Sequence, residues 1–260
     1  MLITVEGLVI AERNYGENDR FIDILTAEHG VVEVCVKGAR KLTGSSNAST
    51  QLFSYGKFCY SSRGERYYLN SSEPIRVFYE LRLDIKKLAL AEYFVEVSKY
   101  CATTGQSAKD IMRLLLNSLH FLSKDLRSCG FLKSVFEMRL MSEIGMLPQL
   151  IGCRDCYRYD VDELFFMADR ACLLCGDHFS ERGFVEDEYH IRLTPSVFQA
   201  LQFICLAEMK RIFNFRLGDD SLRLLGEITE KYILTRLSRG FRTLDFYNDI
   251  CKMDDTNSEG

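Results

Sequence analysis

The amino-acid sequence predicts an α+β protein with several domains, in which an N-terminal β-barrel is followed by an α-helical domain that carries a four-cysteine zinc-binding insert. Three observations support this fold class. Short segments rich in Val, Ile, Phe and Tyr fill residues 1–80, apolar residues recur at helical spacing after residue 80, and two Cys-x-x-Cys pairs interrupt the helical part. The chain has 260 residues, enough for about two to three small domains.

The first 80 residues are expected to form five short β-strands, because Gly and Asn residues separate the apolar segments. The connections are too short for crossover helices, and closing the sheet on itself removes unpaired strand edges. We therefore expect a small barrel of the oligonucleotide-binding (OB) type over residues 1–80. The expected strands cover residues 3–11, 20–26, 31–37, 52–61 and 67–70.

The α-helical domain is expected in two parts, residues 81–151 and residues 186–253. In the second part, Thr194 and Pro195 form a typical helix start, and a final helix is expected at 220–237. In the first part, apolar residues at i, i+3 and i+4 spacing predict three helices. These three lie within residues 83–97, 111–122 and 131–144.

Two Cys-x-x-Cys pairs lie in the expected insert, residues 152–185, and 15 residues separate them. This spacing is typical of a site in which two turns close a tetrahedron of thiolates around Zn²⁺. Four thiolates leave no position for water, so the pattern indicates a structural ion and not a zinc hydrolase. The predicted ligands are Cys153, Cys156, Cys172 and Cys175. A redox dithiol is the alternative interpretation, and we interpret His178 as a solvated surface histidine rather than as an alternative ligand.

Basic charge is concentrated in the expected barrel, although the whole chain has a net charge of -4 and an isoelectric point near 5.7. Residues 36–68 carry a net charge of +5. Together with a Gly/Ser/Asn/Thr-rich loop at 43–50, expected to be mobile, this excess is typical of a surface that follows a phosphate backbone. A solvated basic face is the alternative interpretation. The predicted nucleic-acid-binding residues are Lys37, Arg40, Lys41, Lys57, Arg63 and Arg66.

Aromatic residues are interleaved with these basic residues and offer faces on which bases stack. A barrel this small also needs aromatic side chains in its core, so at least half of them are expected to be buried. The six residues are Phe53, Tyr55, Phe58, Tyr60, Tyr67 and Tyr68.

Other features of the sequence argue against several classes of protein. Glu6 interrupts the apolar N-terminal stretch and no basic leader precedes it, so no export signal is expected, and no segment is apolar enough to span a membrane. We therefore expect a cytoplasmic protein with reduced cysteines and a disordered polar tail at 254–260. The sequence has neither a P-loop nor a Gly-x-Gly-x-x-Gly motif and no evident catalytic set, so we expect no bound nucleotide and no enzymatic activity.

Several short motifs follow one another along nearly the whole chain. They are NYGENDR (14–20), TAEHG (26–30), KGARK (37–41), FEMRL (136–140), GMLP (145–148), the four cysteines and RGFRTL (239–244). In this combination the chain resembles the RecO family of bacterial recombination and repair mediators. One departure follows the KGARK motif, where Leu42 and residues 45–47 replace basic residues that many relatives carry, which predicts a lower affinity for DNA.

The resemblance implies an N-terminal OB-fold, binding to single- and double-stranded DNA, and annealing of complementary strands. It also implies two protein partners, RecR and the acidic C-terminal tail of the single-stranded-DNA-binding protein. With these partners, a RecO protein helps to load the RecA recombinase onto DNA. The alternative to this function is a zinc-ribbon adaptor that bridges proteins without contacting DNA, and a metal-dependent enzyme is disfavoured by the four thiolates.

The implied site for the acidic tail is expected on the helical domain, where basic side chains lie beside apolar ones. The residues that suggest it are Arg113, Lys133 and Arg139. The alternative interpretation of these three residues is the ordinary polar surface of amphipathic helices.

Overall fold

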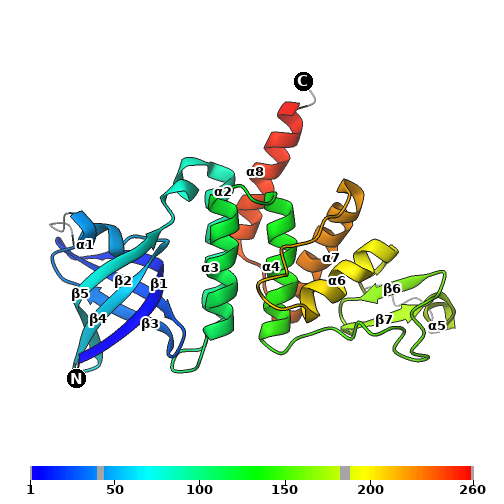
Figure 1. Cartoon of the computed structure of the whole chain (residues 1–260), viewed down its shortest axis with the longest axis horizontal. Helices are drawn as coiled ribbons and strands as arrows, with labels where there is room; N and C mark the ends of the chain where they lie inside the picture. Colours follow the sequence, from blue (N-terminus) through cyan, green and yellow to red (C-terminus); the bar gives the residue numbers. More distant parts are fainter. Residues whose placement is uncertain (1, 40–43, 182–187, 259–260) are drawn as a thin grey trace. The chain divides into compact units, whose positions relative to one another are not determined.

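The computed structural model describes residues 2–39, 44–181 and 188–258 (Figure 1). They form two compact units. The N-terminal unit comprises Met1–Lys124 together with Phe241–Gly260, and the central unit comprises Asp125–Gly240. The unit that contains the barrel therefore extends to residue 124, well beyond the expected boundary at residue 80, and includes the C-terminal segment.

Five strands in the N-terminal unit form a closed barrel in the order β1-β2-β3-β5-β4. The prediction of an OB-like, β-rich N-terminal domain is confirmed, although β5 is much longer than expected. Neighbouring strands are antiparallel except β3 and β5, which are parallel and pair only at Val34 with Tyr67 and at Cys35 with Tyr68. The strands are β1 (Leu2–Tyr15), β2 (Asp19–Thr26), β3 (Gly30–Val36), β4 (Ser54–Arg63) and β5 (Arg66–Val77).

Every second residue of a barrel strand points inward, and apolar side chains occupy most of these positions in the barrel. A glycine is required at position 56, where a Cβ atom would lie 2.4 Å from the carbonyl oxygen of Glu73 on the neighbouring strand. The pairing register of β4 and β5 shifts at this close approach, between Tyr55 and Gly56. The interior residues include Val5, Val9, Ile22, Ile24, Val32, Val34, Phe58 and Tyr60.

In the segment at 43–50, where a loop was expected, residues 44–49 form a short helix, α1 (Gly44–Ser49). Two contacts explain the order of this segment. The Ser49 and Ser72 hydroxyl oxygens lie 2.7 Å apart and join the helix to β5, and the Thr50 hydroxyl donates to the carbonyl of Asn47. Residues 40–43 lie outside the described residues.

Four further elements complete the N-terminal unit: η2 (Tyr79–Leu83), α2 (Ile85–Cys101), α3 (Lys109–Ser123) and α8 (Arg242–Ser258). Helix α8 was not predicted, and it includes residues 254–258, which are therefore not the expected disordered tail. It is anchored to α2 by Glu96, whose carboxylate accepts hydrogen bonds from the N–H and the hydroxyl of Thr243 at 3.3 and 2.5 Å. The ring of Phe241 packs edge-on against Tyr93 of α2.

In the described part of the central unit, three long helices and one short helix accompany a small three-stranded sheet of order β7-β6-β8. Its helices begin close to the predicted positions, and Thr194 caps α6 as expected, its hydroxyl accepting from the N–H of Val197. The insert contains strands and a short helix. The elements are α4 (Cys129–Glu143), β6 (Leu164–Met167), β7 (Cys172–Cys175), α5 (Gly176–Glu181), β8 (His190–Arg192), α6 (Pro195–Leu206) and α7 (Asp219–Leu237).

Candidate metal centre and nucleic-acid interface

The first Cys-x-x-Cys pair lies on a tight turn in the central unit. The Cys153 N–H donates to the carbonyl of Arg158, and the Tyr157 N–H donates back to the carbonyl of Cys153, both at 2.8 Å. Gly152 allows the turn to close, since a Cβ atom there would lie 2.7 Å from the carbonyl oxygen of Tyr157. This geometry brings the Cys153 and Cys156 side chains to the same side of the turn, as in a zinc knuckle.

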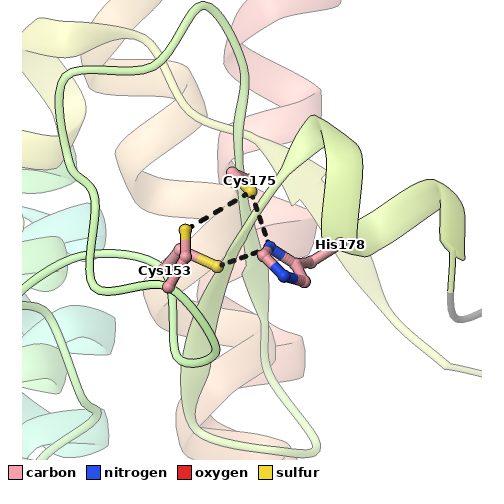
Figure 2. Close-up of side chains that lie close together, drawn as sticks. Cys153, Cys175 and His178 are labelled. Atoms are coloured by element: carbon pink, nitrogen blue, oxygen red, sulfur yellow. Dashed lines mark hydrogen bonds between the residues drawn. The ribbon is translucent and has the colours of Figure 1, made fainter.

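Four potential ligands converge on this turn: Cys153, Cys156, Cys175 and His178, with their ligand atoms all within 4.8 Å of one another. The Cys156 and Cys175 sulfurs are 3.9 Å apart. Figure 2 shows His178 facing Cys153 and Cys175, and its Nδ1 atom is 3.6 Å from the Cys153 sulfur and 3.1 Å from the Cys175 sulfur. Two sulfurs bound to one tetrahedral Zn²⁺, each at about 2.3 Å, lie about 3.8 Å apart. The donor types and most of these separations therefore fit a single tetrahedral metal ion.

The structure differs from the predicted set of four cysteines at one position, where His178 replaces Cys172. Cys172 and Cys175 are the two ends of strand β7, and residues three apart in a strand point to opposite faces of the sheet. The second Cys-x-x-Cys pair therefore does not form a knuckle. Cys172 is buried in a small cluster that also contains Leu174, Cys153 and Cys175, but its sulfur is not among the four converging ligand atoms. His178 follows in α5, and the Cys-x-x-His spacing from Cys175 is the sequence signal that identifies it.

The protein environment favours the metal-binding form of Cys156. Hydrogen bonds from the backbone N–H and the side chain of Arg158 lower the pKa of Cys156 to about 6. A thiolate at this position is consequently stable near neutral pH, and the thiolate is the form that binds metals. Burial raises the pKa of Cys175, as expected for a thiol in an apolar setting.

Three of the predicted nucleic-acid-binding residues gather around one tyrosine at one end of the barrel. Lys37 Nζ lies 5.3 Å, and the Arg63 guanidinium carbon 5.6 Å, from the centre of the Tyr68 ring. The side chains of Tyr15 and, to a smaller extent, Tyr68 raise the pKa of Arg66, which places its guanidinium beside both tyrosines. We call these five residues the basic-aromatic cluster. Its basic members are exposed, and Tyr15 was missed by sequence reasoning because it is distant in sequence from the others.

The remaining predicted residues are not brought into this cluster. Lys57 is on β4, six residues before Arg63, which corresponds to about 20 Å along a strand. Its cross-strand neighbours are Glu6 on β1 and Glu73 on β5, so its charge is locally balanced. The predicted Arg40 and Lys41 lie outside the described residues.

The six interleaved aromatic residues divide evenly between core and surface, as predicted. Phe53, Phe58 and Tyr60 are buried, whereas Tyr55, Tyr67 and Tyr68 are partly exposed. The exposed three are therefore the ones with ring surface available to a ligand.

Two of the three residues expected at a peptide-binding surface have partners within the central unit. The Lys133 ammonium is buried and pairs with Glu137 at 2.9 Å and Glu230 at 2.7 Å. Arg139 donates to three backbone carbonyls at the end of α6, including that of Ala207 at 2.7 Å. The periodicity of the sequence did not reveal these internal partners, because a basic residue in a helix is normally interpreted as a surface residue. Arg113 is exposed on α3.

Two family models match the chain. "Recombination protein O N terminal" matches residues 1–78, and "Recombination protein O C terminal" matches residues 82–245. The chain belongs to the RecO family. This RecO chain is 30% identical over 248 residues to the "DNA repair protein RecO" of Acetivibrio thermocellus, covering 95% of the chain and 97% of the relative.

Further relatives support the same assignment. The protein of the same name from Alkaliphilus metalliredigens is 28% identical over 251 residues, or 96% of this RecO chain and 100% of the relative. The one from Bacillus pumilus is 26% identical over 232 residues, or 89% and 88%. Family membership places this RecO chain among proteins of DNA repair and recombination. Among the helices that the structure describes, none combines the length and the apolar character needed to span a bilayer.

Proposed function

We propose that this protein is a recombination mediator that binds single- and double-stranded DNA through the basic-aromatic cluster of its barrel. The observation that carries the proposal is the convergence of Lys37, Arg63 and Arg66 on Tyr68 at one end of the barrel. Cations spaced along a surface neutralise phosphates, and exposed aromatic rings offer stacking faces to bases.

The position of the cluster in the barrel supports this role. OB-folds bind oligonucleotides at the end where the β1–β2 and β4–β5 loops meet. Tyr15 ends β1, and Arg63 and Arg66 flank the two-residue turn between β4 and β5. The carboxylate of Asp19, at the start of β2, accepts a hydrogen bond from the N–H of Gly38 at 2.9 Å and fixes the chain beside Lys37.

The annealing activity follows from charge neutralisation. Two DNA strands repel each other through their phosphates, and a protein that neutralises phosphates on both strands lowers this repulsion. No step of this mechanism breaks a covalent bond, so we propose that the protein is a mediator and not an enzyme. We further propose that it acts in the cytoplasm with RecR and with the acidic tail of the single-stranded-DNA-binding protein, and that it helps to load RecA.

The metal centre has a structural role in this proposal. Cys153, Cys156, Cys175 and His178 fit a tetrahedral Zn²⁺ in their donor types and spacing. They join the turn at 153–156 to strand β7 and helix α5. When bound, the ion supplies a cross-link that a small insert with little apolar core needs for its stability.

Charge reversal tests the proposed DNA interface. The double variant Arg63→Glu and Arg66→Glu should lose most of its affinity for a labelled single strand in fluorescence anisotropy, and should anneal complementary strands more slowly. Lys57→Glu is the matched control, because it makes the same kind of charge change on the same barrel outside the cluster. Equal binding by the double variant and the wild type would contradict the proposal.

The protein partners are tested separately with purified RecR and a peptide of the acidic tail. Binding of both by a protein that does not bind DNA at low salt would support the adaptor function instead. Binding of DNA together with either partner supports the mediator function.

A further inference from the structure

We propose that a pocket beside the basic-aromatic cluster binds one unstacked nucleobase, and that it prefers a base with an exocyclic amino group. This inference rests on the proposed DNA binding and adds a base-binding site to it. The pocket lies where strands β3 and β5 separate, because their parallel pairing is confined to Val34 with Tyr67 and Cys35 with Tyr68. Before Val34, the strand edge of β3 faces the pocket instead of a neighbouring strand.

The walls of the pocket are mostly apolar and aromatic. Phe21, Val31, Tyr60 and Tyr67 line it together with Ile3, and its volume is about 370 Å³. This volume is near the lower end of the range of about 300–1,000 Å³ in which proteins hold small organic ligands, so it suits a single base better than a larger molecule. The Tyr67 ring packs edge-on against Tyr60, with centroids 5.1 Å apart, while the residue is 37% exposed.

The far wall of the pocket is held in place by backbone hydrogen bonds. The N–H of Gly105 donates to the carbonyl of His29 at 2.9 Å, and both residues line the pocket. Gly30 has a φ of +64°, and a Cβ atom there would lie 2.2 Å from the carbonyl oxygen of Thr103. The turn between β2 and β3 is therefore packed tightly on the 103–105 segment, and a preformed site loses little entropy on binding.

The polar groups of the pocket explain the expected preference. Glu33 and Glu65 both line it, and the Glu33 carboxylate is already paired with Arg13. Among the described residues, Glu65 takes part in no ion pair, so its carboxylate is available as a hydrogen-bond acceptor. A carboxylate accepts from the N4 amino group of cytosine, whereas thymine offers a carbonyl oxygen at the same position.

Arg66 connects the pocket to the basic-aromatic cluster. It is a lining residue of the pocket, and it is flanked in β5 and at the β4–β5 turn by the cluster residues Tyr68 and Arg63. A strand whose phosphates contact the cluster can therefore turn one base into the pocket without leaving the surface. Tyr67 supplies the stacking face, Arg66 holds the adjoining phosphate, and Glu65 reads the amino group.

The test compares three strands of equal length by fluorescence anisotropy: oligo(dC), oligo(dT) and an abasic sugar-phosphate strand. The wild type should bind oligo(dC) several-fold more tightly than oligo(dT), and the abasic strand at least ~5-fold more weakly than either, because base–aromatic stacking is lost. Tyr67→Ala should lower the affinity for oligo(dC) towards that for the abasic strand, and Tyr67→Phe should retain it. Tyr79→Ala is the control, since Tyr79 is an exposed tyrosine of the same unit that does not line the pocket.

Glu65→Gln separates recognition of the amino group from stacking. This variant should lose the preference for oligo(dC) over oligo(dT) and keep the difference between both and the abasic strand. The base pocket is contradicted if Tyr67→Ala binds all three strands like the wild type while Arg63→Glu with Arg66→Glu loses binding. If the wild type binds none of the strands, the proposed DNA binding fails as well.

Discussion

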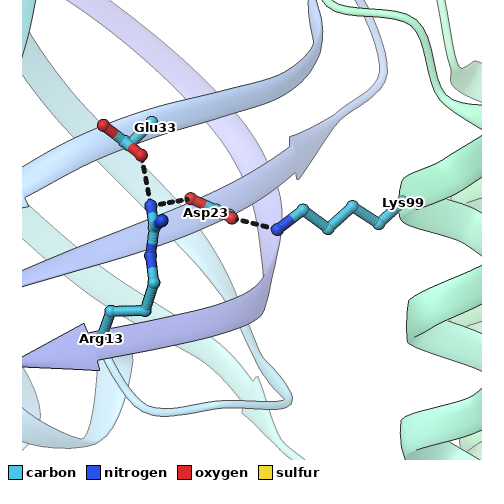
Figure 3. A network of polar contacts seen from close by, with 4 residues as sticks. All are labelled: Arg13, Asp23, Glu33 and Lys99. Carbon is cyan, nitrogen blue, oxygen red and sulfur yellow. Dashed lines mark hydrogen bonds and ion pairs between the residues drawn. The ribbon is translucent and has the colours of Figure 1, made fainter. Parts of the chain in front are cut away.

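Lys99 of helix α2 contacts Asp23 of barrel strand β2, with 2.5 Å between the lysine Nζ and the carboxylate Oδ2 (Figure 3). The Asp23 side chain is only 6% exposed, while Lys99 is 44% exposed. Arg13 of β1 reaches the other carboxylate oxygen at 3.4 Å and also pairs with Glu33 of β3. A single buried carboxylate therefore links two strands of the barrel to the helix that follows it.

This unequal burial predicts an unequal response to mutation. Lys99→Met leaves the buried Asp23 carboxylate with Arg13, at 3.4 Å, as its one remaining cation and should destabilise the protein by about 1–3 kcal/mol. Asp23→Asn removes the buried charge and leaves two cations that water can reach, so it should cost less. Urea unfolding measures both, and the double variant should be more stable than Lys99→Met alone. A double variant that is less stable than Lys99→Met would contradict this explanation.

The metal centre predicts which residues release the ion when they are changed. His178→Ala or Cys175→Ala should lower the metal content of the purified protein, because each removes one of four ligands. Cys172→Ala should keep its metal and show only the modest loss of stability that follows removal of a buried sulfur. Elemental analysis of dialysed protein distinguishes these results. If His178→Ala retained its metal and Cys172→Ala lost it, the four cysteines would be the ligands, and the ligand set with His178 would be wrong.

Chelation offers a second test of the same centre. Removal of the ion should loosen the insert, with faster amide hydrogen exchange in β7 and α5, because the ligands cross-link these elements to the first knuckle. Exchange in the barrel strands should change much less, since the barrel has its own apolar core. Equal changes in both regions would show that the ion supports the whole protein.

The buried pair of Lys133 and Glu137 predicts a large effect of one substitution. Glu137 is fully buried, and its carboxylate also accepts a hydrogen bond from the Thr229 hydroxyl at 2.8 Å. Lys133→Met should destabilise the protein by about 3–5 kcal/mol, because a buried carboxylate loses its counter-charge. Lys133→Met combined with Glu137→Leu should recover a large part of this loss in urea unfolding. If the double variant is no more stable than Lys133→Met, the pair does not act as a unit.

The elements predicted with most success have strong local patterns. Segments rich in Val, Ile, Phe and Tyr, separated by Gly and Asn, located the five strands, and Thr194 with Pro195 located the start of α6 because capping is a local interaction. Helix α8 was missed, since its sequence is polar and its start depends on Glu96, a residue about 150 positions away. The extent of the N-terminal unit was missed for a similar reason, because sequence does not show which helices pack on the barrel.

The candidate sites show the same limit. The spacing of the cysteines located the metal centre but not its fourth ligand, because strand β7 directs Cys172 and Cys175 to opposite faces. Counting charges along the sequence located the basic segment. It also grouped Lys57 with the cluster residues, although in the barrel Lys57 lies opposite Glu6 and Glu73, away from the cluster. Lys133 and Arg139 are held inside the central unit by partners that are distant in sequence, Glu230 and the carbonyl of Ala207. A local pattern of basic and apolar residues therefore did not distinguish buried from exposed cations.

The salt dependence of single-strand binding tests the role of the basic-aromatic cluster most directly, and fluorescence anisotropy measures it from low to moderate ionic strength. Each neutralised phosphate contributes about 0.7 to the slope of log affinity against log salt concentration. The triple variant Lys37→Gln, Arg63→Gln and Arg66→Gln should therefore lower the slope by about 2, whereas Lys57→Gln should leave it unchanged. Equal slopes for the wild type and the triple variant would show that DNA is bound elsewhere, and would contradict the account of the basic-aromatic cluster.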